Sequence, residues 1–211
     1  MHLDLNEIKI RKHNFNHYWC SKWLLPWWIG SLEAKNGDQI VKPINGAQSN
    51  FDEIIITQDW HPQSHKCFAI NHGLEEYSTI KLPYGPQILW PEHCVQNTKG
   101  ASLNTNLNTS KANLILRKGS NNDIDSYSAF FENDKKTSTG LVGYLKSKDI
   151  ESIYLCGLAF DFCVFYSAID AVNLGFNVYV IENLTKSIDL NSSKDTAKKA
   201  MLEQNIKLIN F

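Results

Sequence analysis

From about residue 38 to the C-terminus, short apolar runs alternate with longer segments in which apolar residues recur every three or four positions. The short runs predict buried strands at residues 52–57, 113–117, 152–155, 176–181 and 206–209. The longer segments predict helices at residues 38–48, 139–148, 161–174 and 192–204. Strands that alternate with helices form right-handed β-α-β units. We therefore expect an α/β fold, with a doubly wound, mostly parallel sheet and helices on both faces.

The segments that follow three of these strands carry reactive side chains. In a doubly wound sheet, sites form beyond the carboxyl ends of the strands, where loops leave for the next helix. The segments after residues 57, 116 and 155 meet this condition. The first, residues 58–112, is rich in Asn, Gly, Pro and Thr, and a loop that long within a domain is usually functional.

The last of these segments places a cysteine at the start of a helix. The pattern of residues 152–164 predicts a strand, a tight turn and a helix, with Asp161 as its N-cap. Cys163 then lies in the first helical turn, where backbone N–H groups and the helix dipole favour a nucleophilic thiolate. Most free cysteines are small buried hydrophobes, and this pattern alone favours that role.

The long loop contains a candidate metal site. Asp59 and His61 are two positions apart on an extended segment and point the same way, and His93 offers a second imidazole. A carboxylate and two histidines suit zinc, iron or manganese, and His65 is a further candidate. Such an ion can generate a nucleophilic water at neutral pH. A lone Asp-x-His also occurs where these residues only cap a turn.

Three more residues fit a thiol site for a flat substrate. Lys118 directly follows a buried strand, where its ammonium would pair with the Cys163 thiolate, although most lysines are solvated surface charges. Trp90 and Tyr127 offer flat apolar faces to a ring, and either could equally belong to the core.

Composition excludes several classes of function. The formal net charge is −1, with both signs interspersed, which predicts neither nucleic-acid nor membrane-surface binding. No apolar run approaches the roughly 20 residues of a membrane span, and no secretory signal is evident. The five cysteines lack paired spacing, so we expect free thiols and a cytoplasmic protein. A length of 211 residues predicts a single domain over residues 1–211.

Four motifs together resemble the nicotinamidases of the isochorismatase-like hydrolase family. The resemblance covers about residues 30–211 in the family's order, and the motifs are Thr57–Pro62 (TQDWHP), Trp90–Gln96 (WPEHCVQ), Arg117–Gly119 (RKG) with Asp125–Phe130 (DSYSAF), and Gly157–Val164 (GLAFDFCV). It implies an isochorismatase-like fold. It also implies hydrolysis of nicotinamide to nicotinate and ammonia through a cysteine thioester, with a divalent metal, feeding NAD salvage.

By matching motif, the resemblance assigns catalytic roles. Cys163 would attack the amide carbon, and Lys118 would stabilise its thiolate. The N–H groups of Ala159 and Cys163 would form the oxyanion hole, where each donor can contribute about 2.7–4 kcal/mol. The family has a cis peptide bond at the position of Leu158–Ala159. Phe160 stands where the family usually has threonine.

The same resemblance assigns the binding residues. Asp59, His61 and His93 would ligate the metal, with Zn²⁺ expected first and Fe²⁺ or Mn²⁺ as alternatives. The metal would bind the pyridine nitrogen and supply water. Trp90 and Tyr127 would line the ring pocket, and His65 would be a further ligand or a second-shell partner.

The N-terminus departs from the family. The family's first strand ends in an Asp that acts as general base, followed by Pro-Gly-Gly-Ser-Leu, but no Asp occurs here between Asp4 and Asp38. Glycine codons read one base out of register give tryptophan codons, so Trp27-Trp28 resembles a frame-shifted Gly-Gly. Our hypothesis is that residues 1–29 hold an atypical first strand and loop, with roughly residues 5–29 produced by a frame slip.

Other functions remain open at this stage. One is an amidohydrolase of the same family that acts on another small amide. Another is a catalytically impaired member that binds a metal or ligand, which fits the missing Asp. A redox-sensing thiol protein ranks last, because no resolving cysteine has an obvious spacing. The expected partner is a small molecule, with no nucleic acid and no membrane, and a homo-oligomer is left open.

Overall fold

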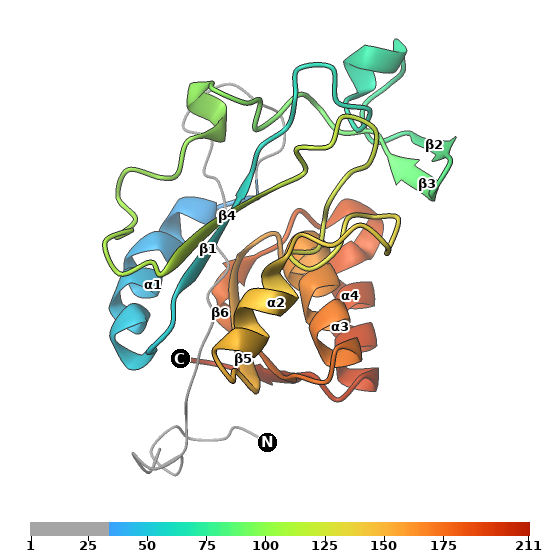
Figure 1. The fold of residues 1–211 in the computed structure, drawn as a ribbon. Coiled ribbons are helices and arrows are strands. Elements are labelled where there is room, and N and C mark those ends of the chain that lie inside the picture. Colours follow the sequence, from blue (N-terminus) through green and yellow to red (C-terminus); the bar gives the residue numbers. More distant parts are fainter. Residues whose placement is uncertain (1–33) are drawn as a thin grey trace.

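The structure, a computed structural model, describes residues 34–211 (Figure 1). The expectation of an atypical first strand and loop at residues 1–29 lies outside the described residues. The helices are α1 (Val41–Ala47), α2 (Leu141–Ser147), α3 (Phe165–Asn173) and α4 (Ser193–Glu203). The strands are β1 (Ile55–Asp59), β2 (Thr79–Leu82), β3 (Gly85–Ile88), β4 (Leu114–Lys118), β5 (Ser152–Leu158), β6 (Asn177–Lys186) and β7 (Lys207–Ile209).

The parallel α/β architecture expected from the sequence is confirmed. Strands β1 and β4 pair in parallel, and β5, β6 and β7 form a second parallel set. Within residues 34–211, no strand pairing joins these two sets. All five residues of β1 are buried, as a continuous apolar run in a parallel sheet predicts.

Helices cover both faces of the parallel strands. Alternate residues of a strand point to opposite faces, and neighbouring residues of β1 accordingly enter different apolar clusters. Ile55 packs in the cluster that contains α2, α3 and α4, and Ile56 packs in the cluster that contains α1. Figure 1 shows α3 and α4 on the side of β5 and β6 away from α1.

Two segments differ from the expectation. The long loop contains an antiparallel hairpin, β2–β3. The residues of β2 alternate between exposed and half-buried positions, and β3 contains a Gly, a Pro and one buried residue, Gln87, so neither strand shows an apolar pattern. The helix predicted from residue 161 begins instead with one turn of π-helix, Phe160–Val164, which continues into α3. Asp161 lies inside this turn and is not its N-cap.

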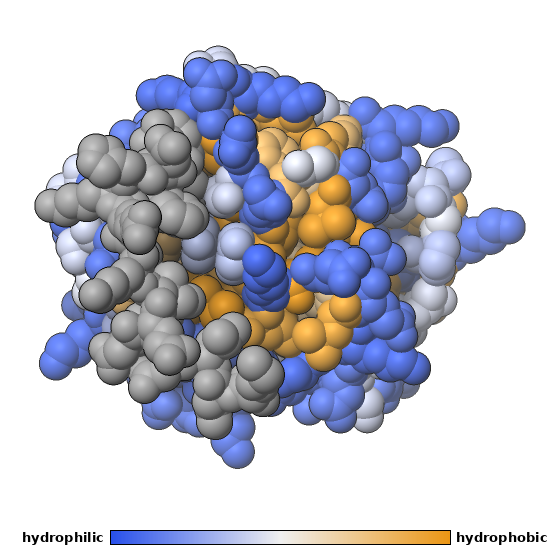
Figure 2. Space-filling model, turned by 90° about the horizontal axis from the view of Figure 1, so that it is seen from below, coloured by the Kyte–Doolittle hydropathy of each residue, from blue (hydrophilic) through white to orange (hydrophobic). Residues whose placement is uncertain are grey.

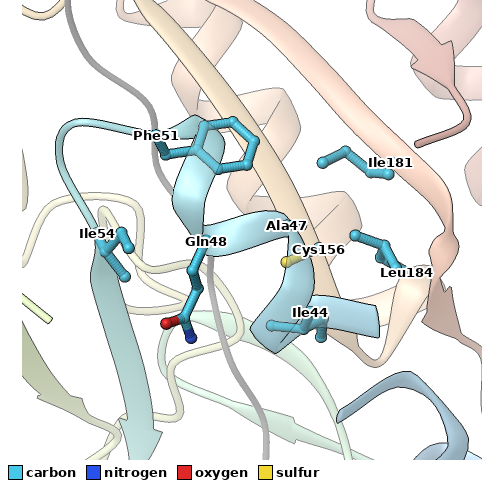
Figure 3. Close-up of a pocket in the computed structure, with 8 residues that line it drawn as sticks. All are labelled: Ile44, Ala47, Gln48, Phe51, Ile54, Cys156, Ile181 and Leu184. Carbon is cyan, nitrogen blue, oxygen red and sulfur yellow. The ribbon is translucent and has the colours of Figure 1, made fainter. Parts of the chain in front are cut away.

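No helix among the described residues has the length and apolar character needed to cross a bilayer. Figure 2 shows apolar side chains gathered near the middle of the face seen from below, with hydrophilic side chains among them. A small apolar hollow lies between α1 and strands β5 and β6 (Figure 3). None of the described residues that line it is charged or a histidine, so we look for the candidate site elsewhere.

Candidate active site

Strands β1 and β4 bring an acid and a base together at their carboxyl ends. Their parallel register sets Asp59 opposite Lys118, the last residue of each strand. Nζ of Lys118 lies 2.7 Å from Oδ1 of Asp59, and these side chains are only 1% and 8% exposed. The strand-end expectation therefore holds for this pair.

The turn after β5 brings Cys163 to the same place. Nζ of Lys118 lies 3.7 Å from Sγ of Cys163, and it also donates a hydrogen bond to the carbonyl of Ser126 at 2.5 Å. Three segments that are distant in the sequence thus converge on one buried ammonium. The geometry brings Cys163 and Lys118 together as expected.

The protonation of this pair differs from the thiolate expected at the sequence level. Burial raises the pKa of the Cys163 thiol, and the nearby Lys118 offsets this only in part. Burial opposes the charge on Lys118, but Asp59 and Cys163 outweigh it, so the pKa of Lys118 is raised as well. A raised pKa favours the neutral thiol over the thiolate, so the thiol needs a proton acceptor before it can attack.

Asp59, His61 and His93 form a group that fits a divalent metal ion. One donor atom from each lies within 4.8 Å of the others. The Nδ1 atoms of His61 and His93 each lie 2.8 Å from a backbone carbonyl, of Gly119 and of Pro91. When Nδ1–H donates to these carbonyls, each Nε2 presents its lone pair to an ion. Burial, with the charge on His93, lowers the pKa of His61 well below its ordinary value, which keeps that ring neutral.

Gly119 is a site residue that the sequence analysis did not single out. A Cβ added to it would lie 2.4 Å from Cε1 of His61, and its φ is +64°. Only glycine tolerates both the close approach and this backbone conformation. The Arg-Lys-Gly motif could have indicated this role, because a glycine directly after a strand-end lysine allows another side chain to approach the backbone closely.

His65 lies beside the metal group rather than within it. The described residues offer a second group of donor atoms, made of His61, His65, Cys67 and Asp125. The N–H of Cys67 donates to Nδ1 of His65 at 3.0 Å, so the neutral ring carries its proton on Nε2. A protonated Nε2 cannot ligate a metal, and this favours the supporting role over the ligand role.

Trp90 and Tyr127 meet in an aromatic cluster close to Cys163. Nε1 of Trp90 donates to the Tyr127 hydroxyl at 3.0 Å, and Phe162 packs edge-on against Trp90 with the ring centroids 4.8 Å apart. Tyr166 lies 5.1 Å from Tyr127 between centroids. Sequence reasoning missed Phe162 and Tyr166, although both flank Cys163 in the helical pattern.

Gln87 ties this cluster to the hairpin. Its side chain is 1% exposed, and its Nε2 donates to Oδ2 of Asp125 at 2.9 Å and to the Tyr127 hydroxyl at 3.1 Å. A buried amide with these partners fixes the orientation of the tyrosine ring. The sequence gives no sign of this role, because Gln87 is a polar residue in a short strand that contains Gly and Pro.

The backbone before Cys163 follows the expected course. The Leu158–Ala159 peptide bond is cis, as the resemblance implies. The carbonyl of Ala159 accepts hydrogen bonds from the N–H groups of Phe162 and Val164, at 3.2 and 3.1 Å. Ala159 and Cys163 therefore belong to one compact turn at the end of β5.

Comparisons with known proteins agree with this arrangement. Residues 32–210 match the family model described as Isochorismatase domain, close to residue 30, where the resemblance was expected to begin. A nicotinamidase from Acinetobacter baylyi is 50% identical over 182 residues, which cover 86% of this chain and 85% of that protein.

Solved structures give the same picture. The Acinetobacter baumannii nicotinamidase superposes with a TM-score of 0.88 at 44% identity, covering 92% of this chain and 94% of that one. The yeast nicotinamidase bound to the inhibitor nicotinaldehyde has a TM-score of 0.82 at 29% identity, covering 92% and 100%. A Pyrococcus horikoshii pyrazinamidase in complex with zinc has a TM-score of 0.72 at 27% identity, covering 92% and 99%.

Proposed function

This chain belongs to the isochorismatase-domain family, and we propose that it hydrolyses nicotinamide to nicotinate and ammonia. The observation that carries the proposal is the convergence of Cys163, Lys118 and the Asp59–His61–His93 group at the carboxyl ends of β1, β4 and β5. Similarity to nicotinamidases over most of the chain supports nicotinamide as the amide. The nicotinate formed would feed NAD salvage. We also propose that residues 1–211 form a single domain.

The reaction we propose has two stages. In the first, Sγ of Cys163 bonds to the amide carbon while the thiol loses its proton; the C–N bond then breaks, and the nitrogen leaves as ammonia after gaining a proton. In the second, water adds to the thioester, the S–C bond breaks, and nicotinate and the free thiol result. The N–H groups of Ala159 and Cys163 would hold the oxyanion in both stages, and Lys118 would stabilise the charge on sulfur.

A divalent metal ion would be held by Asp59, His61 and His93. The donor set of one carboxylate and two imidazoles suits Zn²⁺ first, with Fe²⁺ or Mn²⁺ as alternatives, and the zinc-containing relative favours zinc. When bound, such an ion acts as a Lewis acid toward the substrate and lowers the pKa of a coordinated water. His65 would support the group through its contact with His61, whose ring centroid lies 4.6 Å away.

The pyridine ring would lie against Trp90 and Tyr127. These side chains present flat apolar surfaces, and the Gln87 network holds them in a fixed orientation. A rigid aromatic wall selects a planar ring over a flexible aliphatic amide, because the pocket does not have to reorganise on binding.

A catalytically impaired protein that binds a metal or ligand is the second candidate. The observation that favours it is the raised pKa of the Cys163 thiol, because such a thiol needs a proton acceptor. The neighbouring Asp59 carboxylate forms an ion pair with Lys118, which makes it a poor acceptor. The family's base, an Asp near the start of the chain, has no counterpart between Asp4 and Asp38. The proton acceptor would then be inefficient or missing, and turnover would be slow.

One purified sample tests both candidates. Metal content, ammonia release and nicotinate formation are measured together, for the native chain and for Cys163→Ala. Nicotinamide turnover that requires Cys163 and exceeds turnover of a panel of other small amides supports the proposal. Bound metal with equal ammonia release from both proteins would favour the binding protein, and a faster reaction with another amide would replace nicotinamide as substrate.

A further inference from the structure

Asp161 is a buried carboxylate two residues before Cys163 that serves neither the metal group nor its own helix. It is 3% exposed and lies within the π-helical turn Phe160–Val164. Its two oxygens accept hydrogen bonds from the N–H of Ile188 at 3.0 Å, the N–H of Asp189 at 2.7 Å and the hydroxyl of Ser193. Because one carboxylate accepts from three donors, Asp161 holds a separate segment, residues 188–193, against the turn.

That segment joins β6 to α4, and several of its residues have an unfavourable backbone conformation. Asp189, Asn191 and Ser192 all have positive φ angles, of 61°, 52° and 61°. For residues other than glycine this region costs free energy, so the surrounding contacts must hold the segment in place. The first residue of α4, Ser193, bonds directly to Asp161, and α4 contacts the π-helical turn.

We infer that Asp161 is a positioning residue that fixes the turn carrying Cys163 by tying it to residues 188–193. This inference rests on the proposed function, because it assigns Asp161 to the reaction of the Cys163 thiol. The turn sets the direction of Sγ toward Lys118 and the direction of the Ala159 and Cys163 N–H groups. A shift of about 1 Å in such a constellation can reduce reactivity 10²-fold.

A matched control lies on the same helical stretch. Asp170 is also buried, at 6% exposed, and pairs with Nζ of Lys135 at 2.8 and 2.9 Å, away from residues 188–193. Substitution of either aspartate by alanine removes a buried carboxylate and leaves its donors without their acceptor, although the Lys135 side chain is 45% exposed and can be solvated. Only the Asp161 substitution releases the segment that braces the Cys163 turn.

Two probes separate positioning from general loss of structure. Nicotinaldehyde can add the Cys163 thiol across its carbonyl: an S–C bond forms, the C=O π bond opens to an alkoxide in the oxyanion hole, and the thiol proton neutralises it. Nicotinate carries the same ring but binds without forming a bond to Sγ of Cys163. In Asp161→Ala we expect nicotinaldehyde affinity to fall by roughly 10–100-fold while nicotinate affinity changes by less than about threefold. In Asp170→Ala neither affinity should change by more than about threefold.

Conservative variants keep the test valid if Asp161→Ala does not fold. Asp161→Asn retains one accepting oxygen and should lose less nicotinaldehyde affinity than the alanine variant. Ser193→Ala removes a single donor and should lose less again. Equal losses for both probes, or no loss in any of these variants, would overturn the positioning role.

Failure of the proposed function has a different signature. If the native chain binds neither probe, nicotinamide chemistry is wrong, and alkylation of Cys163 by iodoacetamide decides the positioning role. A rate constant at least about tenfold lower in Asp161→Ala than in the native chain and Asp170→Ala would support it. Equal rates would overturn it. Cys67 and Cys94, which are buried, report unfolding if they become alkylated.

Discussion

Nζ of Lys118 lies 2.7 Å from Oδ1 of Asp59, at the ends of two neighbouring parallel strands and almost completely buried. This ion pair links the metal group to the thiol, because the same ammonium lies 3.7 Å from Sγ of Cys163. Burial raises the pKa of the Cys163 thiol, Lys118 lowers it only in part, and the Asp59 carboxylate raises it further. Burial and the Lys118 ammonium, and not only the position at the start of a helix, therefore set the pKa of the Cys163 thiol.

Replacing Lys118 with methionine should destabilise the metal-free protein. The substitution leaves the Asp59 carboxylate buried without its cation, and breaking a buried pair in this way costs about 3–5 kcal/mol. Urea unfolding of the metal-free variant measures the loss. Adding Asp59→Asn to Lys118→Met should restore part of the stability, and an unchanged free energy of unfolding in the single variant would show that the pair is not held as described.

Substituting Gly119 by alanine should weaken metal binding. The new Cβ would meet the His61 ring at 2.4 Å, and the ring would have to leave its contact with the Gly119 carbonyl. We expect at least the roughly 10–100-fold loss of metal affinity typical of disturbed outer-shell contacts. Competition with a metallochromic chelator gives the affinity.

Gly143→Ala provides the matched control for that measurement. Gly143 lies in α2, and nothing lies within 4 Å of a Cβ added there. The exchange should leave metal affinity unchanged and raise the free energy of unfolding by about 0.5–1 kcal/mol, because alanine loses less backbone entropy in a helix. A Gly119→Ala protein that binds metal as tightly as this control would contradict the assigned place of His61.

The Tyr144 hydroxyl should make stability fall in alkaline solution. It donates a hydrogen bond to the buried Glu53 carboxylate, and burial together with this carboxylate raises its pKa to about 12. The folded state keeps a proton that the unfolded state loses near pH 10, so this contribution is complete below that pH and declines as the pH rises toward 12. Unfolding by urea at a series of pH values from 8 to 11.5 measures the decline.

Tyr144→Phe tests the same contact from the other side. At neutral pH the variant should be less stable by about 1–3 kcal/mol, because Glu53 loses a hydrogen bond in a buried position. Its alkaline decline should also be shallower than that of the native chain. Parallel pH profiles for the two proteins would remove Tyr144 as the cause.

Nicotinamide turnover by this sequence should be slow relative to its Acinetobacter baylyi relative. General base help is typically worth 10²–10⁴-fold, and the sequence lacks an Asp at the position where the family has its base. Side-by-side kcat measurements on the two proteins under one set of conditions test this. Rates within tenfold of each other would mean that another group accepts the proton, and sequencing the 5′ region of the gene would then address the frame-slip hypothesis separately.

The sequence by itself determined the order of the parallel strands and of the helices, and the residues at the strand ends. Hydrophobic periodicity is a local property, and the parallel topology it implies brings Asp59 and Lys118 to one edge without further information. The four motifs carried the family, which the match over residues 32–210 confirms. The first conclusion uses periodicity along the chain, and the second uses the resemblance of these motifs to the family.

Only the tertiary structure decided what surrounds those residues. The neutral state of the Cys163 thiol follows from burial, and burial depends on segments that are far apart in sequence. Asp161 looked like a helix cap, but its partners lie in residues 188–193, which follow the carboxyl end of the neighbouring strand β6. Desolvation and long-range hydrogen bonds depend on how distant segments pack, and residue spacing along the chain does not specify this packing. The sequence therefore identifies the residues of the site, and the tertiary structure sets their reactivity.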